Sequence, residues 1–188
     1  IINRNVVYNT AAITDANSRS GCVYYKHGSA TGAYTATHNI LWNCAHGALL
    51  SGTSGTTFAN NRVFDSEIAI GIDTRGDNFY FYGNEIENNT VKNTPIFIQY
   101  NPSSTYATIG SLNVHDNVWI DNQASAYNCD VNSVWRIDPY GSDAAYNLVH
   151  SPETITANNN CYYNSAAQAL KFCDFGQNAD FGALRTFA

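Results

Sequence analysis

A short pattern anchored on asparagine recurs along the chain and limits the fold more than any other feature. Each copy begins with Asn, has an apolar or aromatic third residue and ends with Asn or Asp. The copies are NVVYN, NILWN, NRVFD, NEIEN, NVWID and NCYYN, which begin at Asn5, Asn39, Asn61, Asn84, Asn117 and Asn160. The steps between them are 34, 22, 23, 33 and 43 residues. We interpret the longer steps as a 22-residue period with insertions.

A second alternating segment follows every anchor. These segments are VYYKH, ALLSG, IAIGID, IFIQY, VWRID and ALKFC, which begin at Val23, Ala48, Ile68, Ile96, Val134 and Ala169. A period of two is typical of strands, whereas helix-pair repeats are longer and show a period of 3.6. A strand rises about 3.3 Å per residue, so about 22 residues are enough for three short strands joined by tight turns. The sequence therefore predicts an all-β solenoid of about six coils, in which stacking buries what one coil cannot.

The recurring Asn needs its own explanation, because Asn is a poor strand former. An Asn at the same inward bend of every coil can bond the backbone or the next amide along the axis. Asn also tolerates the left-handed conformation of a sharp bend. Since buried polar groups are paired, we predict a ladder of stacked amides. A surface turn is the alternative, and the common register of the anchors favours the ladder.

The N-x-[VIL]-x-[ND] anchors, followed by a strand such as IAIGID at 68–73, resemble the right-handed parallel β-helix proteins of the pectate-lyase-like superfamily. The resemblance covers nearly all of 1–188, which we treat as a single domain. It implies a right-handed parallel β-helix. It also implies a secreted or cell-surface, bacterial, carbohydrate-active protein with a polysaccharide partner. The ends are expected to lack caps, so further domains or a neighbouring chain are expected partners.

The charge and composition of the chain narrow the classes of binding partner. The net charge is −6, and without a basic stripe a nucleic-acid partner is disfavoured. No apolar run approaches the roughly 18 residues of a membrane span. The chain opens on the strand-like IINRNVVYN, which indicates a segment of a longer protein. Its five cysteines match no zinc module, and they are either buried thiols or form one or two disulfides.

In the resembled enzymes the substrate lies along the sheet formed by the second alternating segments. Alternation places Ala69, Gly71 and Phe97 on the outer face of this sheet. The candidate catalytic residues on or beside it are Asp73, Asp138 and Arg136. The candidate substrate-binding residues are Lys26, Gln99, Tyr100, Tyr140 and Lys171. Solvated charges on a sheet face would give the same pattern, so the assignment is a hypothesis.

Two reactions fit these residues. Asp73 and Asp138 lie two coils apart, about 9.6 Å along the axis, which is close to the carboxylate separation of inverting hydrolases. Elimination needs a base and a cation, but Lys26 and Lys171 lie five coils apart. The net negative charge argues mildly against an acidic polymer. Hydrolysis is slightly favoured, and the sequence does not decide between hydrolase, lyase and non-catalytic protein.

The remaining signals are weaker. No cofactor is expected, although Asp73, Asp77 and Asn78 could supply oxygen ligands to Ca²⁺. No HxH or HExxH pattern indicates another metal. We predict that His46 and His115 are loop residues bonded to the backbone, and a proton shuttle beside the groove is the alternative. The alternative to a carbohydrate-active protein is a structural or adhesive solenoid, such as a surface fibre or a tailspike part.

Overall fold

The computed structural model describes twelve segments of the chain. They are 1–9, 21–26, 34–51, 55–73, 80–81, 84–101, 108–109, 112–121, 134–137, 155–164, 172–174 and 177–179. All regular structure in these segments is strand, so the predicted all-β class is confirmed for them. None of the described residues belongs to a helix that is long and apolar enough to cross a membrane.

Three parallel sheets account for most of the strands. The first sheet contains β1 (Ile2–Asn3), β4 (Thr35–Thr37), β7 (Thr57–Ala59), β11 (Asn84–Glu87), β15 (Leu112–His115) and β18 (Ile155–Asn158). The second contains β2 (Val6–Tyr8), β5 (Ile40–Trp42), β8 (Arg62–Phe64), β12 (Thr90–Lys92), β16 (Val118–Asp121) and β19 (Cys161–Asn164). The third contains β3 (Val23–Lys26), β6 (His46–Ser51), β9 (Ile68–Asp73), β13 (Ile96–Asn101), β17 (Trp135–Ile137) and β20 (Phe172–Asp174), with β21 (Gln177–Ala179) antiparallel to β20. The short strands β10 (Tyr80–Phe81) and β14 (Thr108–Ile109) form a separate parallel pair.

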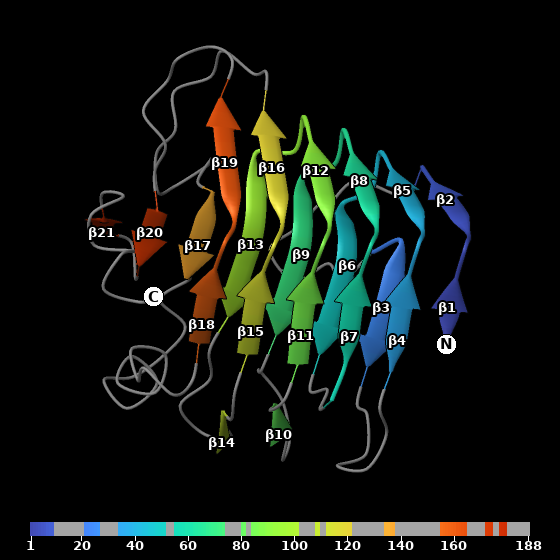
Figure 1. Ribbon diagram of the computed structural model, residues 1–188, viewed down its shortest axis with the longest axis horizontal. Helices are drawn as coiled ribbons and strands as arrows, with labels where there is room; N and C mark the ends of the chain where they lie inside the picture. Colours follow the sequence, from blue (N-terminus) through green and yellow to red (C-terminus); the bar gives the residue numbers. More distant parts are fainter. Residues whose placement is uncertain are drawn as a thin grey trace.

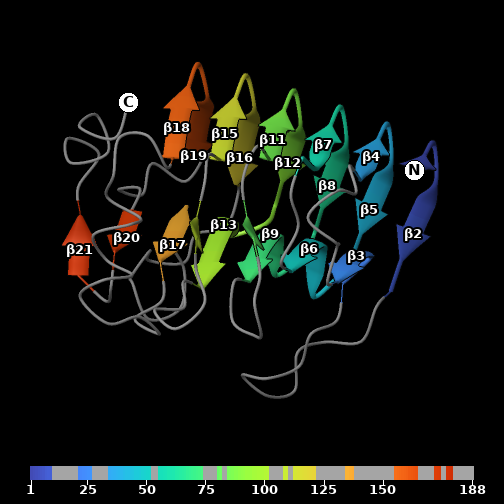
Figure 2. The ribbon, with the colours of Figure 1, turned by 90° about the horizontal axis from the view of Figure 1, so that it is seen from below.

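The chain visits the first, second and third sheets in turn. Each strand then pairs with the strand at the same place in the next repeat, as β5 pairs with β8. In Figure 1 the repeats follow one another from the N-terminal end at the right to the C-terminal end at the left. Figure 2 shows the third sheet apart from the first and second sheets, whose strands overlap in this view. The arrangement is compatible with the predicted parallel β-helix.

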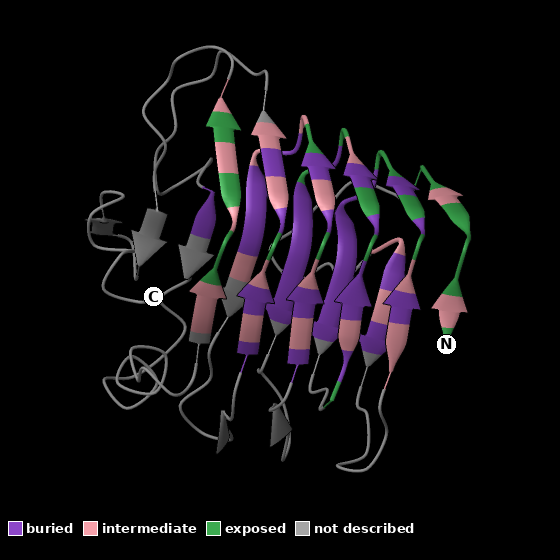
Figure 3. Ribbon diagram, viewed as in Figure 1, coloured by how far each residue is buried: buried purple, intermediate pink, exposed green. Residues whose placement is uncertain are grey.

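The core lies between the three sheets. The second sheet contributes one inward row, with Leu41, Val63, Val91 and Trp119 in register and fully buried. The first and third sheets face this row with their own fully buried apolar side chains, among them Ala36, Phe58, Ile86, Val114, Leu50, Ile70, Ile72 and Ile98. Figure 3 shows the burial concentrated in the middle strands. Removing this apolar surface from water drives the coils to stack.

A continuous amide ladder runs along the bend between the first and second sheets. Its rungs are Asn5, Asn39, Asn61, Asn89, Asn117 and Asn160, at separations of 34, 22, 28, 28 and 43 residues. At each step the Oδ1 of one rung accepts bonds from both the backbone N–H and the Nδ2 of the preceding rung. The predicted ladder is confirmed for these residues.

One predicted anchor was wrong. Asn84 lies inside β11, where its Oδ1 accepts a bond of 3.0 Å from the N–H of Thr56. The rung is Asn89 instead, at the start of the segment NTVKN. Both residues begin an alternating pattern with a suitable third residue. Only the pairing of β11 with its neighbours identifies the residue at the bend.

The left-handed residue of the bend is also not the ladder Asn. It is the residue immediately before each rung, namely Arg4, His38, Asn60, Asn88, Asp116 or Asn159, with φ between 52° and 57°. A second set of left-handed residues follows the strands of the second sheet, at Asn9, Asn43, Asp65 and Asn93. The sharp turn and the inward amide therefore belong to adjacent residues. The ladder Asn is selected for its hydrogen bonds.

Candidate functional site

The first four strands of the third sheet end in polar residues that stand in register. Lys26, Ser51, Asp73 and Asn101 are the last residues of β3, β6, β9 and β13. Backbone pairing aligns Lys26 with Ser51, Ser51 with Asp73 and Asp73 with Asn101. We call these four residues the polar row. Neighbouring strands lie about 4.8 Å apart, so the row places one polar residue at each such step along the axis.

Gln99 and Arg136 belong to a different row from Asp73. Gln99 pairs with Gly71 on one side and with Arg136 on the other. The candidate residues Asp73, Gln99 and Arg136 therefore do not form one column but are divided between two rows. The alternating segments begin at slightly different points of their strands, and only the pairing shows the offset.

Strict alternation also fails near the start of these strands. The described pairing of β6, β9 and β13 omits Gly47, Ala69 and Phe97. Ala69 and Phe97 were predicted to face outward, but both are fully buried in the core. The Phe97 ring meets the ring of Tyr162 edge-on at 6.1 Å, which places it inside the solenoid. Phe97 and Ile98 both donate their N–H to the carbonyl of Val134, which is a local irregularity of the ladder.

The outward face beside the polar row is covered at its centre. A Cβ at Gly71 would lie 2.6 Å from Cδ2 of His46 and 2.9 Å from Cδ1 of Leu49, so both side chains pack over this glycine. His46 and Leu49 are themselves buried. Tyr24 pairs with Leu49 in the same outward row, and its buried hydroxyl has no hydrogen-bond partner among the described residues.

The other predicted site residues are placed only in part. Lys26, Asp73, Tyr100 and Arg136 are placed by their backbone, and Gln99 is half-buried. Asp138, Tyr140, Lys171, Asp77 and Asn78 lie outside the described residues. The strands β9 and β17, which carry or precede Asp73 and Asp138, are separated by β13 alone. Among the described residues, no group of three or more His, Cys, Asp or Glu side chains is arranged to hold a metal ion.

A cluster of charged residues on the first sheet was not predicted. His115 lies in β15, and its Nδ1 is 2.7 Å from Oδ2 of Asp116. Its Nε2 is 3.3 Å from Oε2 of Glu85 and 3.6 Å from Oε2 of Glu87, both on β11. The prediction of a loop histidine bonded to the backbone was wrong. We call these four residues the histidine cluster.

The three carboxylates stabilise the charged imidazole. The pKa of His115 is raised, chiefly by the hydrogen bond to Asp116, with further contributions from Glu85 and Glu87. Partial desolvation acts in the opposite direction. The cluster therefore favours a protonated His115, which links β15 to the carboxylates of β11.

The misplaced anchor explains why the sequence did not reveal this cluster. With Asn84 aligned to Asn117, Glu87 would lie opposite Ile120. The observed pairing instead sets Glu87 opposite His115 and Glu85 opposite Asn113. A correct anchor at Asn89 would have shown acidic residues facing a histidine one strand away.

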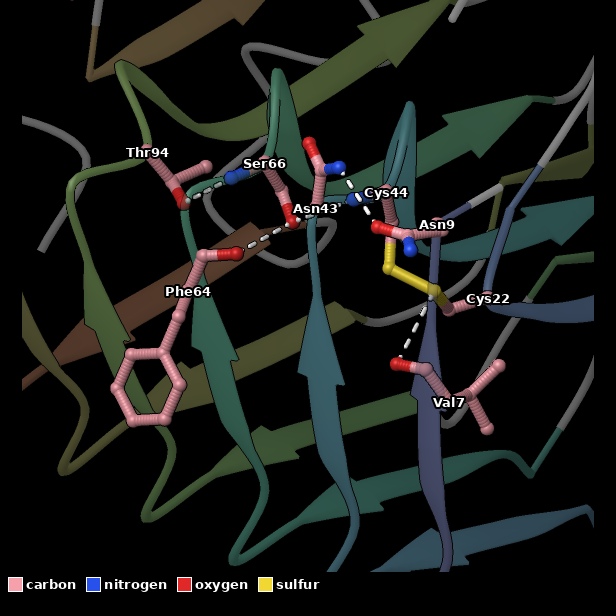
Figure 4. Close-up of a disulfide and its surroundings, with 8 residues drawn as sticks. All are labelled: Val7, Asn9, Cys22, Asn43, Cys44, Phe64, Ser66 and Thr94. Atoms are coloured by element: carbon pink, nitrogen blue, oxygen red, sulfur yellow. Dashed lines mark hydrogen bonds between the residues drawn. A yellow bond between two sulfur atoms is a disulfide. The ribbon is translucent and has the colours of Figure 1, made fainter. Parts of the chain in front are cut away.

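Two of the cysteines form a disulfide beside the second bend. Cys22 and Cys44 precede β3 and β6 in successive repeats and are joined by a disulfide. In the next two repeats Ser66 and Thr94 take the place of Cys44. Figure 4 shows that the N–H of Cys44 donates to Oγ of Ser66, and the N–H of Ser66 to Oγ1 of Thr94. Of the two cysteine alternatives, the disulfide is therefore confirmed for this pair. Cys161 is an exposed free thiol.

No protein-family model, no curated protein and no solved structure matches the chain. Its parallel sheets and buried amide ladder define a repetitive all-β protein compatible with a parallel β-helix.

Proposed function

We propose that this chain forms a right-handed parallel β-helix of the pectate-lyase-like kind, with one coil per three strands and 22 residues as the shortest coil. Its function is to hold a polysaccharide across the carboxyl ends of the third-sheet strands. The observation that carries the proposal is the polar row, in which four consecutive strands end in Lys26, Ser51, Asp73 and Asn101 in register.

A periodic row suits a periodic ligand. Amide, hydroxyl, carboxylate and ammonium groups are the partners that sugar hydroxyls need, and here one such residue stands at every strand spacing of about 4.8 Å.

The disulfide supports a secreted or cell-surface location. Disulfides persist in oxidising compartments and are rare in the cytosol. The pairing of Cys22 with Cys44 joins equivalent places in two successive repeats, so it stabilises the coil stack itself. A protein that meets polysaccharide outside the cell would need this kind of stabilisation.

Hydrolysis is the reaction that we assign if the bound polysaccharide is cleaved. The strand β17 lies two strand spacings from β9, about 9.6 Å, and Asp138 directly follows β17. Asp73 and Asp138 would then act as the base and acid of an inverting hydrolase. Arg136 would position the substrate between them.

A panel of polysaccharides tests binding and cleavage together. Binding is measured by microarray, cleavage by new reducing ends, and elimination by the absorbance of unsaturated uronates. We expect Asp73→Asn to weaken binding or abolish cleavage, and the matched variant Glu67→Gln, an exposed carboxylate of the same repeat, to have no effect. Equal effects of the two variants would reject the polar row as the site. A wild-type protein that binds no polysaccharide would reject the function.

A structural or adhesive solenoid is the second candidate. It is favoured by the burial of Leu49 and Gly71, since an open groove would expose the centre of the outward face. This alternative predicts no glycan product and a strong tendency to self-associate. Sedimentation of the wild-type protein over a range of concentrations separates it from a monomeric glycan-binding protein.

A further inference from the structure

Each first bend carries an exposed left-handed residue directly before its ladder rung. In the repeat of β11 and β12 these two residues are Asn88, which is exposed, and Asn89, which is buried. Thr90 follows them as the first residue of β12 and is half-buried. The three residues form the pattern N-x-[ST], with x other than Pro, which is the acceptor pattern of N-linked glycosylation. This pattern occurs once in the sequence.

The backbone of Asn88 is held in place, whereas its side chain has no structural role among the described residues. Its N–H donates to the carbonyl of His115 at 3.3 Å, and its φ of 52° is left-handed, which Asn tolerates better than most residues. Its side-chain amide makes no hydrogen bond with another described residue. The bend therefore presents the amide of Asn88 to solvent on a fixed backbone.

Asn89 shows why the structure admits a glycan on only the first Asn of the pair. Its Nδ2 donates to the carbonyl of Phe58 and to Oδ1 of Asn117, so both of its amide hydrogens are used. Its Oδ1 accepts two bonds from Asn61. A sugar on a rung would replace one of these hydrogens inside the core and break the ladder. A sugar on Asn88 would break no hydrogen bond between described residues.

The neighbouring coils place short side chains on either side of Asn88. The residues at the same point of the bend in the preceding and following coils are Asn60 and Asp116, and both are exposed. The carboxylate of Asp116 is bonded to the ring of His115. The first bend joins the first and second sheets, whereas the polar row ends strands of the third sheet. A glycan on Asn88 would therefore be attached to a different part of the coil from the polar row.

We propose that Asn88 is an acceptor site for an N-linked glycan, and this proposal does not rest on the proposed function. The donor is a lipid-linked oligosaccharide diphosphate. Nδ2 of Asn88 forms a bond to the anomeric carbon of the first sugar and gives up one proton. The bond from that carbon to the diphosphate breaks, and the diphosphate leaves with the lipid. The reaction takes place in a secretory compartment, which is also where a disulfide such as Cys22–Cys44 forms and persists.

The test expresses the wild-type chain as a secreted protein in a eukaryotic host and measures its intact mass before and after treatment with an amidase that removes N-linked glycans. We expect an added mass that the treatment removes. Asn88→Gln and Thr90→Val should each abolish the added mass, whereas Thr90→Ser should retain it, because a hydroxyl remains at this position. Asn60→Gln is the matched control, since it changes the exposed bend residue of the preceding coil and should leave the glycan in place.

Secreted wild-type protein without a glycan overturns the proposal, and so does a glycan that peptide mass spectrometry assigns to another Asn. The glycan should also leave the fold intact, so its enzymatic removal should not raise the melting temperature. A higher melting temperature after removal would show that the glycan disturbs the first bend, and it would overturn Asn88 as a site compatible with the fold. Polysaccharide binding should be equal with and without the glycan, so a failure of the proposed function leaves the mass measurement unaffected.

Discussion

The two bends of each repeat have the same left-handed backbone conformation but different side chains. At both bends a left-handed residue is followed by an inward polar residue, as Asn60 precedes Asn61 and Asp65 precedes Ser66. At the first bend every described rung is Asn. At the second bend the rungs change along the axis from a Cys22–Cys44 disulfide to hydroxyls.

The difference follows from what each side chain can bond. The Asn61 amide accepts two bonds from Asn39 and donates to the carbonyl of Ala36 and to Oδ1 of Asn89. A hydroxyl has one donor, and that of Ser66 bonds its own strand at the carbonyl of Phe64. Each Asn side chain therefore links directly to the next one, whereas each hydroxyl links only to the backbone of its neighbour. We therefore expect the loss of one rung to lower the stability of the protein more at the first bend than at the second.

The largest effect is expected for Asn61→Ala. The substitution leaves the buried N–H of Asn39 without its acceptor and removes the donor from the buried carbonyl of Ala36. Each unsatisfied buried group costs about 1–3 kcal/mol, so the free energy of unfolding should fall by about 3–5 kcal/mol. Urea titration measures this, with exposed Asn158→Ala as the control. A loss below that of Ser66→Ala would break the proposed ranking of the bends.

The next effect is expected when both Cys22 and Cys44 are replaced by alanine. The disulfide closes a loop of 22 residues, and loops of this size contribute about 3 kcal/mol by restricting the unfolded chain. Thermal unfolding of the variant should match that of the reduced wild-type protein. An unchanged melting temperature on reduction would show that hydrogen bonds suffice at this end of the second bend.

A smaller loss is expected for Ser66→Ala. The N–H of Cys44 loses its acceptor, while the inward methyl group remains compatible with the core. We expect about 1–2 kcal/mol by urea titration. Together with Asn61→Ala, this variant compares the two bends within one repeat. Similar losses would show that the chemistry of the rung matters less than its position.

The smallest effect concerns the outside of the first bend, where Asp116 is the left-handed residue beside His115. The raised pKa of His115 means that the cluster stabilises the fold below the ordinary histidine pKa of 6.5, and that this contribution is lost as the pH rises through the raised pKa. Because Glu85 and Asp116 are substantially exposed, we expect at most about 1 kcal/mol.

The measurement compares the unfolding free energy of wild type and His115→Gln at pH 5.5 and pH 9. The wild-type advantage should be present at pH 5.5 and absent at pH 9. Lys92→Gln serves as the control, because it removes an exposed charge away from the cluster. An advantage that grows with pH would contradict the assigned direction of the pKa shift.

Much of the architecture could be predicted because it depends on neighbours in the chain. The apolar third residue of the anchors includes Leu41 and Val63 of the buried row, and the Asn that begins five of the six anchors is a rung of the ladder. These features repeat because every coil buries apolar residues and pairs its polar groups at equivalent positions.

The candidate site was less predictable because it depends on register between repeats. Gln99 and Asp73 were both candidate residues, but Gln99 pairs with Gly71 and lies in a different row, and Phe97 was placed outside but lies in the core. Asn84 and Asn89 both fit the anchor pattern. Insertions of different length separate the repeats, so local pattern alone could not choose between such alternatives.

The sequence by itself determined a repetitive all-β chain with inward apolar rows and an amide at each first bend, because period-two alternation and turn chemistry act over a few residues. The tertiary structure decided which residues of different repeats meet. It joined Cys22 to Cys44, brought His115 between Glu85 and Glu87, and set Trp42 beside Tyr8. The physical reason is that backbone hydrogen bonds between coils set the register, and a shift of one residue would exchange the buried and exposed faces.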